Sequence, residues 1–152
     1  QKVNEQVLAQ ATANLAKVVQ AGIASTNLSL PQVGLELTGQ IKQTLSRPGS
    51  GRLYKGRRGR GDHRASAPGE PPAPDTGQYR NSWSWRMGAG YVEVGTNLEQ
   101  GPSLEFGSSR MAARPHARPT VAEYATTLGK RIADAHVAAQ KAAIAKLPRA
   151  QQ

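Results

Sequence analysis

The spacing of hydrophobic residues predicts two helices in the N-terminal part of the chain. Apolar residues repeat every three or four positions, as on one face of a helix, at Val3, Val7, Leu8, Ala11, Leu15, Val18 and Val19. Gly22 predicts the end of this first helix. A second helix is predicted to begin at Ser29-Leu30-Pro31, because proline is favoured in a first helical turn. Its stripe consists of Val33, Leu37, Ile41 and Leu45, so residues 1–46 are expected to form two helices.

A longer helical pattern occupies the C-terminal part. Apolar residues recur at helical spacing within residues 119–147, and Pro119 and Pro148 mark the two ends. At 1.5 Å per residue this helix would be about 40 Å long. Its second half is mostly alanine, which permits close approach of another helix but drives little folding alone. We expect its far end to project or to pack on a neighbouring subunit.

An alternating pattern between the helices predicts a β-hairpin within residues 79–107. One face at period two holds Tyr79, Trp83, Trp85 and Met87, which is typical of a half-buried strand. A glycine-rich turn at residues 88–90 leads into a second strand at residues 91–94. Residues 104–106 are expected to form a short helix or a strand end. The pattern therefore predicts an α+β fold in a single domain, residues 1–152: two N-terminal helices, a small antiparallel sheet with a long extended loop, and a long C-terminal helix.

Residues 47–78 form the predicted extended loop, because they offer almost nothing apolar to bury. Its first half alternates glycine with the basic residues Arg52, Lys55, Arg57, Arg58, Arg60 and Arg64, and is expected to be mobile. Its second half, RASAPGEPPAPDTG, is too proline-rich for a helix or a central strand. Its prolines favour an extended course. We expect the whole segment to order on a partner surface.

Composition narrows the possible functions. The net charge is +10, which favours acidic or polyanionic partners, and there is no cysteine to form disulfides or thiolate metal sites. No apolar run approaches the roughly 20 residues that span a bilayer. The three histidines do not lie at metal-ligand spacing, and no catalytic motif is present. We therefore expect no enzyme, no cofactor and no metal.

The basic half of the loop has two interpretations. It can neutralise phosphates without sequence preference, or it can order against acidic surfaces of a partner protein. Tyr54 is its only aromatic residue, so the loop offers a single side chain on which a base could stack. We favour contact with a protein or with a nucleic-acid backbone over a dedicated nucleic-acid module.

Six short blocks follow one another in a fixed order over residues 63 to about 125. They are serine-x-proline-glycine-x-proline-proline, threonine-glycine, a serine in the following strand, valine-glycine-threonine, glutamate-phenylalanine-glycine and arginine-proline. Their residues are Ser66, Pro68, Gly69, Pro71, Pro72, Thr76, Gly77, Ser82, Val94, Gly95, Thr96, Glu105, Phe106, Gly107, Arg114 and Pro115. This ordered set resembles the tail-completion or neck family of long-tailed bacteriophages. The family commonly has a large apolar residue after arginine-proline, where this chain has His116.

The resemblance implies a non-enzymatic virion protein at the head–tail junction, assembled in the host cytoplasm. It implies a ring, of six or twelve copies by analogy, that passes DNA through its lumen. Its neighbours would be other head-completion, tail-terminator or tail-tube proteins, with non-specific contact to packaged DNA and none to a membrane. The expected contact residues are the six basic residues of the loop together with the block residues Ser66, Pro68, Gly69, Pro71, Pro72, Thr76, Gly77, Glu105, Phe106, Gly107, Arg114 and Pro115. The alternative is a non-specific nucleic-acid-binding protein that uses the arginine–glycine loop.

Overall fold

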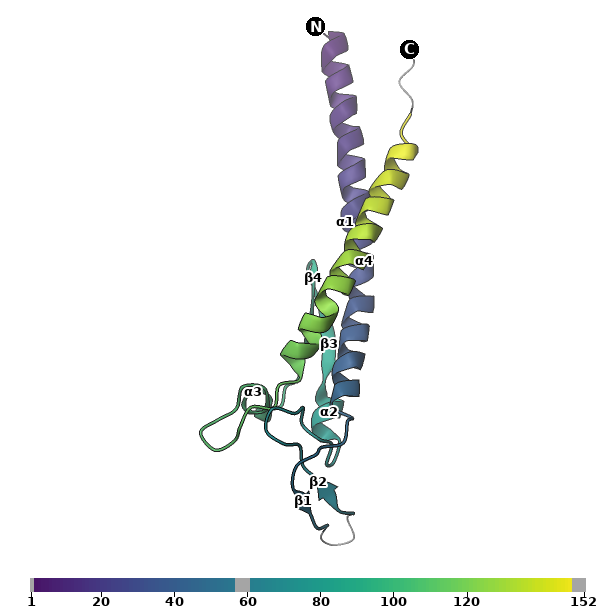
Figure 1. The fold of residues 1–152 in the computed structure, drawn as a ribbon. Helices are drawn as coiled ribbons and strands as arrows, with labels where there is room; N and C mark the ends of the chain where they lie inside the picture. The colour runs from purple at the N-terminus through teal and green to yellow at the C-terminus, as the bar shows by residue number, and fades with distance from the viewer. Residues whose placement is uncertain (1, 57–60, 149–152) are drawn as a thin grey trace.

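Two long helices run side by side, and small elements gather around one end of the pair (Figure 1). The structure is a computed structural model that describes residues 2–56 and 61–148. In chain order the elements are α1 Lys2–Thr44, β1 Leu53–Tyr54, β2 His63–Arg64, α2 Gln78–Ser82, β3 Ser84–Gly88, β4 Tyr91–Gly95, α3 Gln100–Phe106 and α4 Ala117–Ala145. The overall class is α+β, and the predicted long C-terminal helix is confirmed as α4.

The prediction of two N-terminal helices is wrong, because α1 is one continuous helix of 43 residues. Pro31 lies inside it, where it removes one backbone hydrogen bond without ending the helix. Gly22 is buried where α4 crosses α1, and a Cβ at this position would lie 2.7 Å from the imidazole of His136. The same crossing is joined by Ser25, whose hydroxyl donates to the Ala135 carbonyl at 3.1 Å. Gly22 therefore serves close helix packing and does not end the helix.

The predicted hairpin is present as β3 and β4, which pair antiparallel and leave Ala89-Gly90 as a two-residue turn. This hairpin lies against α1 at Gly34. A Cβ on Gly34 would lie 2.7 Å from Val92 and 2.9 Å from the ring of Trp85. A second glycine in α1 thus lets the sheet approach the helix backbone.

The first part of the predicted strand is instead the short helix α2. Tyr79 and Trp83 are four residues apart, a spacing that suits one face of a helix as well as one face of a strand. Their rings pack edge to face with centroids 6.1 Å apart. Trp83 then joins Ile41 and Leu45 of the α1 region in the small buried core, whereas Trp85 is only half-buried.

The segment expected to lack regular structure contains a two-rung antiparallel ladder, in which Leu53 pairs with Arg64 and Tyr54 with His63. Backbone hydrogen bonds from Gly51 to the Ala65 carbonyl, at 2.8 Å, extend this pairing. The expected contact residues Arg57, Arg58 and Arg60 lie outside the described residues. No helix in the described part of the chain is long and apolar enough to cross a membrane.

Candidate functional site

The carboxylate of Glu105 caps helix α4 from a different element. Glu105 lies in α3, is 6% exposed, and accepts hydrogen bonds from the backbone N–H groups of His116, Ala117 and Arg118 at 2.9, 3.0 and 2.9 Å. The guanidinium of Arg118 donates to the same carboxylate at 3.3 Å. Helix α4 has no capping side chain of its own, so Glu105 satisfies its free N–H groups and places a negative charge at its N-terminus.

The same contacts set the ionisation of Glu105. Burial alone would raise the pKa of this carboxyl group, but the three backbone N–H groups outweigh burial and hold the pKa below its usual value. The carboxylate is therefore charged at neutral pH and has its oxygens engaged by α4. This arrangement suits a helix cap, since a general acid would need a raised pKa.

His116 connects the cap to the aromatic core. It is 1% exposed, and its ring packs edge to face against the rings of Trp83 and Tyr79, at centroid distances of 5.6 and 5.4 Å. Its Nε2 lies 2.7 Å from the Tyr79 hydroxyl, and its Nδ1 lies 2.9 Å from the Arg114 carbonyl. Nδ1 also lies 3.0 Å from the Glu105 carboxylate, so both of its neighbours are acceptors and Nδ1 is the donor, while Nε2 is paired with the Tyr79 hydroxyl. Burial raises the pKa of Tyr79 to about 12, so its hydroxyl stays protonated and can donate.

The side chain of Arg114 ties the proline-rich segment to this site. It donates to both the carbonyl and the hydroxyl of Ser66, which is buried. Two backbone hydrogen bonds run in parallel: Gly69 donates to the Ala113 carbonyl at 3.0 Å, and Arg114 donates to the Leu104 carbonyl at 2.7 Å. The loop before α4 is thereby held between the proline-rich segment and α3. We call Ser66, Tyr79, Glu105, Arg114 and His116 the capping cluster.

Other block residues form a second contact nearby. The hydroxyls of Ser82 and Thr96 lie 2.6 Å apart, and Thr96 also accepts from the Leu98 N–H at 3.2 Å. This pair fixes the end of the hairpin relative to α2. Gly77 directly precedes α2 and has a φ of 78°, a left-handed conformation that glycine adopts without steric cost.

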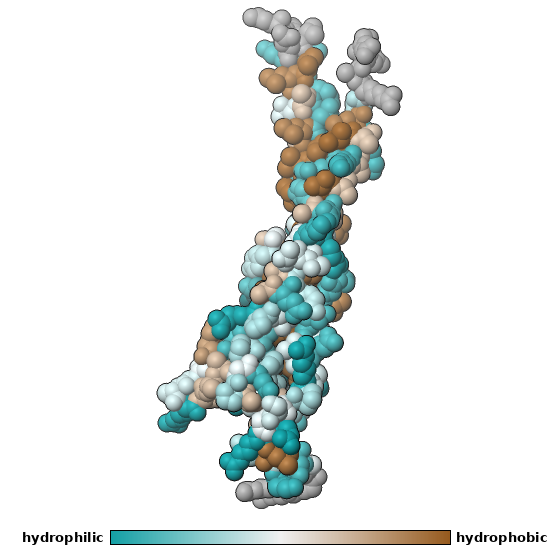
Figure 2. Space-filling model, viewed as in Figure 1, coloured by the Kyte–Doolittle hydropathy of each residue, from teal (hydrophilic) through white to brown (hydrophobic). Residues whose placement is uncertain are grey.

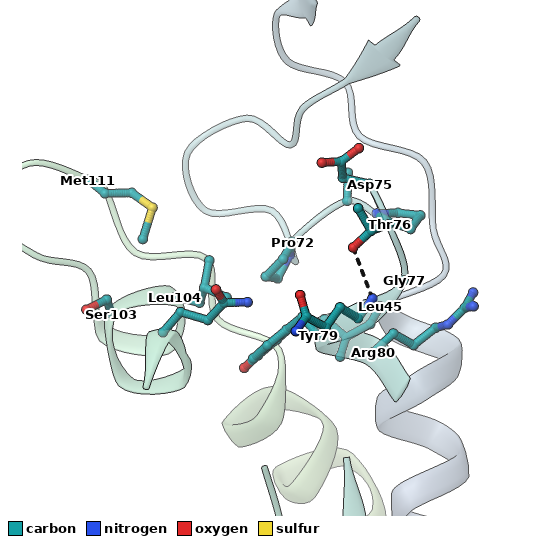
Figure 3. A pocket seen from close by; sticks show the side chains of 14 residues that line it. Leu45, Pro72, Asp75, Thr76, Gly77, Tyr79, Arg80, Ser103, Leu104 and Met111 are labelled. Atoms are coloured by element: carbon teal, nitrogen blue, oxygen red, sulfur yellow. Dashed lines mark hydrogen bonds between the residues drawn. The ribbon is translucent and has the colours of Figure 1, made fainter. Parts of the chain in front are cut away.

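A cleft of about 510 Å³ lies beside the capping cluster (Figure 3). The proline-rich segment supplies Pro72, Thr76 and Gly77 to it, and Leu104 and Met111 lie on its other side. Tyr79 contributes to its wall, while its hydroxyl is held by His116. The cleft is thus formed where the proline-rich segment passes α3.

The predicted contact residues fall into two groups. The structure brings together Ser66, Gly69, Glu105 and Arg114, whose polar groups bond within the chain. Pro72, Thr76 and Gly77 line the cleft, whereas Pro68 and Phe106 are exposed. Pro71, Gly107 and Pro115 are half-buried in the same region. The guanidinium of Arg118 lies over the Phe106 ring at 4.6 Å.

The basic group is separate and lies on the β1–β2 hairpin. Lys55 pairs with Asp62 at 2.9 Å, and the Arg64 guanidinium donates to the Gly51 carbonyl at 3.1 Å. The guanidinium of Arg52 lies over the exposed ring of Tyr54, 5.3 Å from its centroid.

Sequence reasoning missed Tyr79 and His116 as members of the capping cluster. The available signal was His116 itself, because it stands where the resembled family has a large apolar residue. A histidine in an apolar position needs a partner for each ring nitrogen, and this points to a nearby hydroxyl.

Among the described residues, no three histidine, aspartate or glutamate side chains gather as a metal site.

No protein-family model, curated protein or solved structure matches this chain. The resemblance to the phage neck family therefore rests on the ordered blocks alone.

Proposed function

We propose that this protein is a structural component of the neck of a long-tailed bacteriophage. Copies of the chain form a ring that helps to join the DNA-filled head to the tail and passes DNA through its lumen. The observation that carries the proposal is the convergence of the sequence blocks. Matches that arose by chance would fall at unrelated places in the fold, whereas Ser66, Glu105 and Arg114 belong to one hydrogen-bonded cluster.

The shape and charge of the molecule support the same proposal. The capping cluster fixes one end, and the helix pair projects from it (Figure 1). A helix pair that projects from a fixed base has a free surface for neighbouring subunits. The net charge of +10 suits a position beside packaged DNA, since positive charge lowers the cost of bringing phosphates close.

The test is to interrupt the gene in the phage that encodes the protein. DNA-filled heads and free tails should then accumulate separately, and electron microscopy counts them against joined particles. Supplying the wild-type chain in trans should restore joining. Joined and infectious particles that form without the protein would refute the proposal.

A matched pair of variants refines this test. Glu105→Ala removes the cap of α4 and should fail to restore joining, whereas Glu123→Ala on the exposed face of α4 should restore it. If both variants restore joining, the cap that Glu105 provides is not required for the function.

Non-specific nucleic-acid binding is a second candidate, favoured by the Arg52–Tyr54 pair. An exposed ring beside a guanidinium can stack on a base while nearby cations meet the backbone. Titration of DNA at several salt concentrations separates the candidates. The neck proposal expects weak binding that falls steeply with salt. Tight binding at physiological salt that Tyr54→Ala abolishes would favour the second candidate.

A further inference from the structure

The two long helices leave an open wedge at the end far from the capping cluster. Near Gly22 they pack closely, and a Cβ there would lie 2.7 Å from His136 and 3.1 Å from Gln140. Beyond this crossing the N-terminal part of α1 and the C-terminal end of α4 diverge (Figure 1). Among the described residues, the side chains of α1 that would continue the packing before Val18 are therefore exposed, whereas those of α4 are half-buried.

The inner faces of this wedge are apolar. On α1 they continue the helical spacing from Gly22, and on α4 from His136, through Val7, Leu8, Ala11, Leu15, Val18, Ala139, Ala143 and Leu147. We call these eight residues the apolar wedge. Leu8 and Leu15 are 68% and 64% exposed. Figure 2 shows hydrophobic residues gathered on both helices in this region.

The projecting part of α1 needs a cover to be stable. Outside tertiary contacts, a helix of this length is marginal in water even when its sequence is rich in alanine. Residues 5–21 include valine, threonine and asparagine, which lower helix stability further. A continuous apolar face of this size on a folded protein typically marks a contact with another molecule.

The charge of the region decides which molecule fits. The chain carries +10 overall, yet Glu5 and Lys17 are the only charged residues in the sequence from 5 to 35. At 100° per residue, Glu5 and Lys17 point about 100° and 140° from the direction of Gly22. On α4, Lys141 and Lys146 point about 140° and 80° from the direction of His136, so no charged side chain lies among the wedge residues. The apolar faces themselves therefore carry no cation to bind a nucleic acid or an anionic membrane, and the lysines of this region lie beside or behind them. A second copy of the chain presents the same neutral, apolar faces and meets no repulsion.

We propose that neighbouring copies of this chain pack their projecting helices together, apolar wedge against apolar wedge, in one helix bundle. This inference rests on the proposed function, because a ring requires contacts between copies, and it names the surface that makes them. Alanine at positions 11, 139 and 143 allows the helices to approach closely, while the leucines and valines supply the buried area.

Cross-linking tests the contact directly, because the chain has no cysteine. A single cysteine in Leu15→Cys can react only with another copy. A short bismaleimide should join Leu15→Cys to itself or to Ala143→Cys in the full-length protein. Leu28→Cys is the matched control, since Leu28 is 81% exposed on the same helix but lies outside the wedge. Equal cross-linking by Leu28→Cys would overturn the proposal.

Sedimentation supplies the second measurement. Leu15→Glu should raise the dissociation constant of self-association at least about tenfold, whereas Leu28→Glu should leave it within about twofold. Circular dichroism of each variant checks that the fold is kept. A monomeric wild-type protein, or equal effects of the two variants, would overturn the proposal.

The two proposals can fail separately. If Leu15→Glu assembles like the wild type while gene interruption still separates heads from tails, the wedge contact is wrong and the neck function stands. If joined particles form without the protein while Leu15→Cys cross-links selectively, the neck function is wrong and the wedge contact stands.

Discussion

The two ends of this molecule differ in the contacts that their side chains make. At one end the capping cluster saturates its polar groups within the chain, through the bonds of Glu105 to α4 and of Arg114 to Ser66. At the other end the helices present leucine and valine to solvent and make few polar contacts. The first end bonds its capping cluster within one chain, whereas the second presents an apolar face that no described residue covers.

If the apolar wedge joins copies as proposed, this difference separates the residues that stabilise one chain from those that hold chains together. Substitutions at the capped end should act on the free energy of unfolding of the single chain. Substitutions in the apolar wedge should act on association between chains and hardly affect the monomer. The following predictions test this division from the largest expected effect to the smallest.

Leucine-to-alanine substitutions at the two ends give the largest contrast. Leu45 is 1% exposed beside Trp83, so Leu45→Ala should lower the free energy of unfolding by about 4 kcal/mol. Leu15→Ala should change it by less than about 0.5 kcal/mol, because Leu15 is exposed in the single chain. Urea unfolding at low protein concentration measures both. Similar losses at the two positions would contradict the division.

Loss of the helix cap should have the next largest effect. Glu105→Ala leaves the N–H groups of His116, Ala117 and Arg118 without their partner, the first of them buried, and should cost about 3 kcal/mol. Glu123→Ala, on the exposed face of the same helix, should cost less than about 0.5 kcal/mol. Thermal unfolding followed by circular dichroism compares the two. A cost at Glu105 no larger than at Glu123 would show that the cap is dispensable.

Two glycines of α1 should respond in opposite directions. Gly34→Ala places a methyl group within 3 Å of Val92 and Trp85 and should destabilise the protein by about 1–2 kcal/mol. Gly39→Ala meets no atom within 4 Å and should stabilise α1 by up to about 1 kcal/mol. Chemical denaturation of both variants checks the contact between α1 and the hairpin. Stabilisation by Gly34→Ala would mean that the hairpin does not press on this helix.

Acid should weaken the capped end selectively. Because the folded pKa of Glu105 is lowered, its contribution is fully present above about pH 4.3, the usual value for glutamate. That contribution is lost as the pH falls through the folded pKa. The stability of Glu105→Gln should therefore fall less steeply in acid, by up to one proton or about 1.4 kcal/mol per pH unit. Parallel acid profiles for wild type and variant would contradict the ionised cap.

The sequence predicted the α+β class and the C-terminal helix because their hydrophobic spacing is long and regular. It failed at α1, where Gly22 is a local signal for a helix end and Pro31 is one for the start of a new helix. Tertiary packing overrides these signals, since α4 and the hairpin need glycine at close approach. The start of β3 was missed because Tyr79 and Trp83 satisfy helical and strand spacing equally.

The candidate site was predicted only in part. The blocks identified Glu105, Arg114 and Ser66 as important, but the sequence does not state that Arg114 bonds to Ser66 across 48 residues or that His116 links Arg114 to Glu105. The fold decides which donors a buried carboxylate meets, because the N–H groups of any helix N-terminus placed beside it can bond to it. Tyr79 and His116 meet only when α2 packs beside the start of α4, which no local pattern encodes.

The crossing of α1 and α4 also sets an order of events during synthesis. Ser25 and Ala135 touch although 110 residues separate them, so the ribosome must make all of those residues before the contact can form. At bacterial and eukaryotic elongation rates this takes roughly 5–20 s. Until then α1 lacks its partner helix, so its leucines and valines are not covered by α4. If copies pair through the apolar wedge as proposed, nascent chains on one messenger have this interval in which to pair before either chain is complete.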